Sequence, residues 1–159
     1  MKDILQKQIK AFMTKDVLAV KKDETIKHLF QLMDSHGILS VPIVDESNVV
    51  VGIVTESNLI KHFTTLKNPQ GIHLLGSMVY LEDLTAFNEK LKDHCSEVVA
   101  DLMSNPVVTI SPEATLLDAL NLMTEEKVNR LPVVDEGHHL MGIITRTDVL
   151  HQLAQIKKI

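Results

Sequence analysis

Thr145 and Asp148 are the first residues in the chain whose types and spacing suggest chemistry, because a hydroxyl and a carboxylate stand three residues apart where an apolar run ends. Two roles fit this spacing. In a capping box, the threonine caps a helical N–H and the carboxylate reaches back to the N-cap backbone. In a binding site, free N–H groups at the helix start attract an anion, and the carboxylate accepts hydrogen bonds from a ribose diol. Local chemistry leaves both roles open.

The phrase around these residues occurs twice in the chain. GIVTESNLI at residues 52–60 is nearly repeated as GIITRTDVL at residues 142–150, and Asn58 stands where the second copy has Asp148. The same offset aligns most of both copies without a gap. One structural unit is therefore used twice, and we expect the copies to pack on each other about a pseudo-twofold axis.

The elements that must position these residues follow from the hydrophobic period of each copy, which predicts strand, helix, strand, turn, strand and helix. In the second copy we expect a strand at 106–110, a helix with Ser111 as N-cap and Pro112 in its first turn, strands at 130–134 and 140–144, and a helix after Thr145. The first copy has corresponding segments at 17–20, 25–35, 39–44, 49–54 and 57–66. This order predicts an α/β (α+β) fold.

The chain divides into residues 1–66, an inter-repeat segment at 67–98, and residues 99–159. Within the middle segment, residues 68–71 predict a turn, residues 72–81 are apolar, and residues 83–94 have the period of a helix. A connection with this much apolar content is expected to pack on the repeats rather than to be a flexible linker.

The motifs of the second copy resemble a CBS domain, the module named after cystathionine β-synthase. They are the opening MSNPVVTI, the strand RLPVVD and the closing GIITRTDVL; the first copy, from MTKDVLAV to GIVTESNL, is a looser match. The resemblance implies two tandem β-α-β-β-α repeats. It also implies a regulatory module that binds AMP, ADP, ATP or S-adenosylmethionine in clefts between the repeats, forms a homodimer through its helices, and signals to a partner protein.

The resemblance assigns roles to individual residues. Asp148 would hold the ribose hydroxyls, Thr145 and Thr147 would lie near the ribose and phosphate, and Arg130 would face the phosphates. The adenine would contact the opposite copy near Val17, Ile38 and Leu39. The second cleft would be built from Thr55, Ser57, Asn58, Val107, Val128 and Asn129. Asn58 departs from the family pattern, and because an amide lacks the charge that strengthens such hydrogen bonds, we expect this second cleft to be weaker or empty.

Composition and charge argue against several other functions. The net charge is −5 and aromatic residues make up 3% of the chain, which disfavours nucleic acid as a partner. The longest apolar stretch, at 71–81, is too short to span a membrane. A single cysteine and the absence of a signal-peptide pattern favour the cytoplasm. No His-Glu-x-x-His, Cys-x-x-Cys or catalytic constellation is present, so we expect no metal, no cofactor and no enzymatic activity.

The rival hypothesis is a ligand-free CBS scaffold that mediates protein interaction or oligomerisation. It would be favoured if Asp148 were occupied in its own helix cap.

Overall fold

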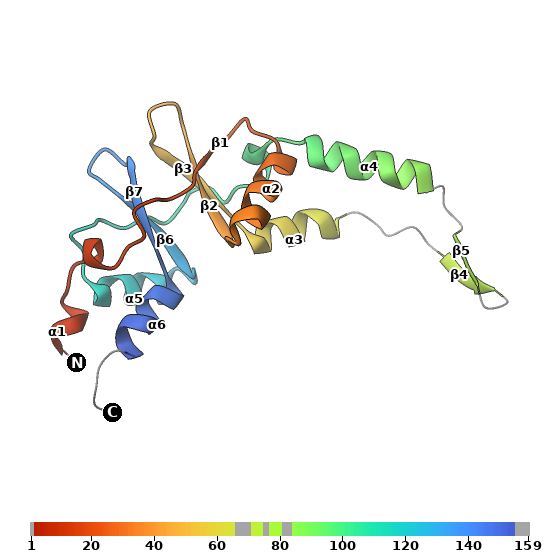
Figure 1. Cartoon of the computed structure of the whole chain (residues 1–159). Coiled ribbons are helices and arrows are strands. Elements are labelled where there is room, and N and C mark those ends of the chain that lie inside the picture. The colour runs from red at the N-terminus through yellow and green to blue at the C-terminus, as the bar shows by residue number, and fades with distance from the viewer. Residues whose placement is uncertain (1, 66–70, 75–76, 81–83, 155–159) are drawn as a thin grey trace. The chain divides into compact units, whose positions relative to one another are not determined.

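The computed structural model describes residues 2–65, 71–74, 77–80 and 84–154 (Figure 1). The first repeat contains β1 (Val20–Lys21), α2 (Ile26–His36), β2 (Ser40–Val44), β3 (Val50–Thr55) and α3 (Glu56–Thr64). The second contains α5 (Leu116–Glu125), β6 (Arg130–Val134), β7 (Leu140–Thr145) and α6 (Arg146–Ala154). The remaining elements are α1 (Lys2–Leu5), η1 (Ile9–Ala11), β4 (Gly71–Leu74), β5 (Ser77–Tyr80), α4 (Leu84–Ser96) and η2 (Val99–Asp101). The predicted mixture of helices and strands in two repeats is confirmed.

The chain forms two compact units that do not coincide with the repeats. Unit 1 consists of residues 1–19, 42–53 and 105–159, and unit 2 consists of residues 20–41 and 54–104. The segment that precedes the first repeat therefore belongs with the second repeat, and the segment that precedes the second repeat belongs with the first.

Matching hydrogen bonds hold these leading segments in each unit. In unit 1, the Ile9 N–H donates to the Ala114 carbonyl over 2.8 Å, and the Leu116 N–H donates to the Lys7 carbonyl over 3.0 Å. In unit 2 the counterparts at the same offset are Val99 N–H to the Glu24 carbonyl at 2.8 Å and Ile26 N–H to the Glu97 carbonyl at 2.9 Å. The two copies therefore correspond in structure also at the segments that come before them in the chain, and not only at the closing motifs.

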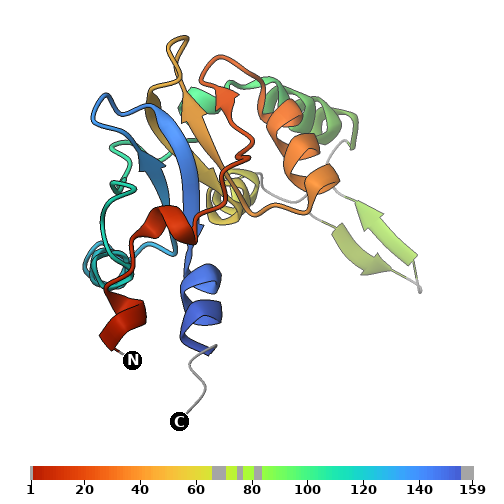
Figure 2. The same ribbon diagram turned by 60° about the vertical axis from the view of Figure 1, so that its left-hand side comes forward.

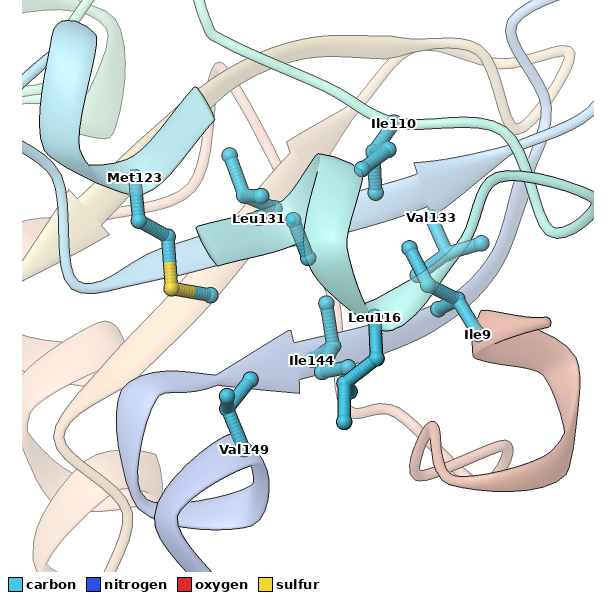
Figure 3. Packing of buried hydrophobic residues seen from close by; sticks show 9 residues of the cluster. Ile9, Ile110, Leu116, Met123, Leu131, Val133, Ile144 and Val149 are labelled. Carbon is cyan, nitrogen blue, oxygen red and sulfur yellow. The ribbon is translucent and has the colours of Figure 1, made fainter. Parts of the chain in front are cut away.

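The main apolar cluster of unit 1 lies where α5 and α6 cover the β6–β7 hairpin (Figure 3). Its buried members are Ile9, Ile110, Leu116, Ala119, Met123, Leu131, Val133, Ile144 and Val149. They come from alternate positions of the strands and from one face of each helix, which is how period-2 and period-3.6 segments bury a common core. Removal of this apolar surface from water fixes the two helices on the hairpin.

The β6–β7 hairpin places the residues of the second closing motif. The two strands are antiparallel, and Arg130 at the start of β6 lies opposite Thr145 at the end of β7. The intervening turn is closed by Asp135, whose Oδ1 accepts hydrogen bonds from the N–H groups of Gly137 and His139, each at 2.9 Å. The backbone hydrogen bond from His139 is the main reason that the pKa of Asp135 is lowered.

Two sequence predictions about the start of the second repeat are wrong, whereas the helix expected at 25–35 in the first repeat is found as α2. The helix expected from Ser111 begins at Leu116, with Thr115 as its N-cap. Ser111 instead forms a local turn in which its hydroxyl donates to Glu113 over 2.9 Å, so the serine–proline signal marks a turn and not the helix start. The strand expected at 106–110 is reduced to one bridge between Ile110 and Val133. In the first repeat, β1 likewise covers only Val20–Lys21.

The inter-repeat segment contains an antiparallel pair, β4 and β5, followed by α4. The helix expected at 83–94 is confirmed as α4, which contacts α2 (Figure 2). The expected turn at 68–71 lies mainly outside the described residues. No helix in the described part of the chain combines the length and apolarity needed to cross a bilayer; the cytoplasmic location stays a prediction.

Candidate functional site

The junction between β7 and α6 holds Asp148 in a capping box. The backbone N–H and the hydroxyl of Thr145 donate to Asp148 Oδ2 over 2.8 and 2.7 Å, and the Asp148 N–H lies 3.3 Å from the Thr145 hydroxyl oxygen. Within the described residues, Asp148 Oδ1 accepts no hydrogen bond. The local capping interpretation is therefore correct, but it uses one carboxylate oxygen and leaves the other for a further donor.

Other predicted residues lie around this junction in unit 1. Arg130 is the strand partner of Thr145, and the Arg146 N–H donates to the Asn129 carbonyl over 2.7 Å. Thr147 is exposed in the first turn of α6, whereas Asp148 is half-buried. The structure thus brings Thr145, Thr147, Asp148 and Arg130 together at one end of a hairpin, where the N–H groups of a helix start also lie.

The equivalent junction in the first repeat differs at one atom. Asn58 Oδ1 accepts from the Thr55 N–H at 2.9 Å and the Thr55 hydroxyl at 2.8 Å, which reproduces the cap. Its Nδ2, however, donates to the Ser104 hydroxyl over 3.2 Å. Both polar atoms of the Asn58 side chain therefore already have partners within unit 2.

Sequence reasoning did not identify Ser104 as part of this junction. The residue lies in the MSNPVVTI motif, 46 positions from Asn58, and only the tertiary fold brings the two side chains together. The one signal in the sequence was the position of Ser104 in a repeated motif.

The predicted adenine contacts divide between the two units. Val17 lies half-buried in unit 1, and Ile38 and Leu39 lie in unit 2. Ile38 and Leu39 line a groove of about 260 Å³ in unit 2; its other lining residues are Phe30, Met33, Asp34, Gly37, Glu56 and Leu59. The joint contact of Val17, Ile38 and Leu39 with one adenine stays a prediction.

The remaining residues of the predicted second cleft are Ser57, Val107, Val128 and Asn129. Ser57 is exposed in unit 2, next to Asn58. Val128 and Val107 belong to unit 1, where Val128 packs against the main apolar cluster and Val107 against a smaller cluster of Val44, Val50 and Val134. The contribution of these residues to ligand binding also stays a prediction.

A third capping box provides a reference for the two junctions. At the start of α5, the Thr115 N–H and hydroxyl donate to Asp118 Oδ2 over 2.8 and 2.7 Å, the same distances as at Asp148. The backbone hydrogen bond from Thr115 is the main cause of the lowered pKa of Asp118. Asp118 therefore performs the capping role alone, outside any predicted ligand contact.

These observations define a class of chain in which two copies of a small α/β unit each end in a capped strand-to-helix junction. The family model for the CBS domain matches residues 8–65 and 99–155. The chain therefore belongs to the CBS-domain family, as the motifs indicated.

Relatives and solved structures extend the similarity over nearly the whole chain. The chain is 30% identical over 152 residues to the uncharacterized protein MJ1426 of Methanocaldococcus jannaschii, covering 91% of this chain and 90% of that protein. It is 30% identical over 136 residues to an inosine-5'-monophosphate dehydrogenase of the same organism, but it spans only 21% of that enzyme and 86% of itself. The crystal structure of Arabidopsis thaliana CBSX2 in complex with AMP superimposes with a TM-score of 0.71 at 25% identity, covering 95% of this chain and 98% of CBSX2.

Proposed function

We propose that the chain is a non-enzymatic regulatory module that binds an adenosine-containing ligand at the β7–α6 junction and passes the bound state to a partner protein through a change in conformation or assembly. The observation that carries this proposal is the difference between Asp148 and Asn58. Asp148 Oδ1 accepts no hydrogen bond within the described residues, whereas Asn58 Nδ2 donates to Ser104.

The chemistry of the junction suits a nucleoside phosphate. The second carboxylate oxygen can accept hydrogen bonds from ribose hydroxyls, and charge makes such bonds shorter and stronger than neutral ones. The positive end of the dipole of the nine-residue helix α6 favours a phosphate group. Arg130, opposite Thr145, adds positive charge at the same end of the hairpin. The AMP bound to the relative CBSX2 makes AMP the first ligand to test.

The proposal includes one principal site per chain. Asn58 keeps the cap but offers no anionic oxygen, and its amide group already donates to Ser104 over 3.2 Å. A ribose at this junction would gain only a neutral hydrogen bond, without the charge that Asp148 offers. We therefore expect the first repeat to bind the same ligand weakly or not at all.

The proposal also includes a homodimer that forms through the helices of the first repeat. Three large apolar side chains in this region are exposed: Phe30 is 51% exposed on α2, Ile60 is 62% exposed on α3, and Leu39 is 59% exposed between α2 and β2. Phe30 and Leu39 also line the groove of unit 2. The rings of Phe30 and Phe63 pack against each other, so α2 and α3 are neighbours, and exposed apolar side chains on neighbouring helices are typical of an association surface.

Sedimentation of the wild-type chain and a Phe30→Ser variant tests this assembly. Burial of one phenylalanine contributes about 1.5 kcal/mol or more. Because a symmetric dimer would bury one Phe30 from each chain, the substitution is expected to weaken the dimer by about 100-fold. A monomeric wild-type chain at micromolar concentration would contradict the homodimer.

A ligand-free scaffold is the second candidate function. The complete capping box at Thr145 and Asp148 favours it, because the helix start is satisfied without a ligand. A scaffold would use the repeats only to present a surface to a partner.

Calorimetric titration with AMP, ADP, ATP and S-adenosylmethionine separates the two candidates. One binding event per chain with at least one member of the panel supports the proposal. Two equal sites per chain would contradict the role given to Asn58. No heat with any ligand, accompanied by no change in melting temperature, would favour the scaffold.

A further inference from the structure

Two histidines and one glutamate from separate parts of unit 2 converge at the base of the inter-repeat helix. His62 lies on α3, His94 lies in the last turn of α4, and Glu97 follows α4 directly. One ligand atom from each of the three side chains lies within 4.8 Å of the other two. No sequence motif marks this group, because its members are joined only by the packing of α4 against the first repeat.

The fold holds all three residues at defined positions. The Glu97 carbonyl accepts from the Ile26 N–H over 2.9 Å, which fixes the backbone just after α4. The side chains of His62, His94 and Glu97 are 13%, 24% and 40% exposed. The two imidazole rings are 4.8 Å apart between centroids. The group is therefore a packed cluster with one open side, unlike a set of solvated surface charges.

The distances are close to those that a metal ion requires. His62 Nε2 lies 3.6 Å from Glu97 Oε2, and His94 Nδ1 lies 3.8 Å from Glu97 Oε1. Zinc–ligand bonds of about 2.0–2.2 Å in a tetrahedron place ligand atoms roughly 3.3 Å apart. The two observed separations exceed this value by about 0.3 and 0.5 Å, so the ligand atoms have to approach one another slightly when an ion binds.

Competing hydrogen bonds in the cluster are weak. His62 Nε2 lies 3.4 Å from the His94 carbonyl, His94 Nδ1 lies 3.2 Å from the Lys90 carbonyl, and His94 Nε2 lies 3.3 Å from the Thr65 hydroxyl oxygen. All three distances are at or beyond the long end of ordinary hydrogen bonds. Metal binding would therefore replace weak contacts with coordinate bonds.

We propose that His62, His94 and Glu97 form a site for a divalent transition metal ion of the zinc type, which fastens α4 to α3. Two neutral imidazoles and one carboxylate match a common zinc ligand set, with a water molecule in the fourth position. Because α4 has no counterpart in either repeat, the ion would link the inter-repeat segment to the first repeat. This site is independent of the nucleotide proposal.

Zinc titration of the metal-stripped full-length chain tests the site. Zn²⁺ is added in competition with a chromophoric chelator to the wild type, to His94→Ala and to Glu97→Gln. A variant with both His138→Ala and His139→Ala is the matched control, because it removes the same chemical groups from an exposed turn. The wild type and the control are expected to bind one ion per chain with equal affinity, and each ligand variant at least ten-fold more weakly, since even outer-shell changes cost about 10–100-fold.

Far-UV circular dichroism checks that each variant is folded, and Co²⁺ provides a second measurement. Bound to the wild type, Co²⁺ is expected to show the intense visible absorption of a four-coordinate ion, and this band should be lost in Glu97→Gln. Equal zinc affinity in folded His94→Ala and wild type would overturn the proposal and identify the cluster as packed polar side chains that bind no metal. Loss of affinity in the control variant would assign the zinc to the exposed turn and would also overturn it.

Discussion

Substitution of Asp148 separates its capping role from its proposed ligand-binding role. Asp148→Asn leaves an oxygen to accept from Thr145, as Asn58 Oδ1 does in the first repeat at 2.9 and 2.8 Å. Asp148→Ala removes the cap and the ligand group together. Asp118→Ala is the matched control, because Asp118 caps α5 through hydrogen bonds of the same length.

The expected magnitudes follow from these hydrogen bonds. Loss of the cap in Asp148→Ala is expected to lower the free energy of unfolding by about 1 kcal/mol, and Asp148→Asn should leave it nearly unchanged. A hydrogen bond to a charged group contributes about 1.5–3 kcal/mol against about 0.5–1.5 kcal/mol for a neutral one. Asp148→Asn should therefore weaken ligand binding about ten-fold, and Asp148→Ala should weaken it further.

Urea unfolding and calorimetric titration with AMP measure the two effects on the same samples. Asp118→Ala should lose stability while its AMP affinity stays at the wild-type value. Wild-type affinity in Asp148→Asn and Asp148→Ala would refute the ribose assignment. Equal losses of affinity in Asp118→Ala and Asp148→Ala would show that capping alone explains the effect.

Three further predictions concern other parts of the chain. Asn58→Asp should create a second AMP site, raising the stoichiometry from one to two per chain in calorimetry; an unchanged stoichiometry would mean that Ser104 or the surrounding residues exclude the ligand. The lowered pKa values of Asp118 and Asp135 stabilise the fold above the unfolded value of about 3.9, and this contribution is lost as pH falls through the lower folded values. The free energy of unfolding, measured with urea at a series of pH values, should therefore fall less steeply below about pH 4 in Asp118→Asn than in the wild type. Equal slopes would argue against a stabilising role of the ionised Asp118 side chain. Leu131→Ala, at a fully buried position, should cost about 2–5 kcal/mol in urea unfolding, and a cost below about 1 kcal/mol would contradict the described core.

Much of the fold was predictable because the repeat is long and its apolar period is clear. The hairpin strands, the turn at Asp135 and the helix after Thr145 all follow from local patterns. The start of α5 was mispredicted because Ser111 followed by Pro112 is a strong local signal for a helix start. The capping box formed by Thr115 and Asp118 sets the start of α5 instead, because Asp118 accepts hydrogen bonds from both the backbone N–H and the hydroxyl of Thr115.

The candidate site was predictable only in part. The spacing of Thr145 and Asp148 predicted both the cap and a ligand group, but it did not show that the cap uses only Oδ2 of the carboxylate. The contact between Asn58 and Ser104 and the cluster of His62 and His94 join residues that are far apart in the chain. No local pattern encodes such contacts, because they depend on the tertiary packing of segments that are distant in the sequence.

The central claim is that the two junctions are chemically unequal and that the second binds the ligand. The most direct test is a residue-resolved NMR titration of the ¹⁵N-labelled chain with AMP. The amide signals of Thr145 and Asp148 are expected to shift in a saturable manner, while those of Thr55 and Asn58 are expected to remain at their original positions until AMP is in large excess. Equal saturable shifts at both junctions, or shifts at Thr55 and Asn58 alone, would contradict it.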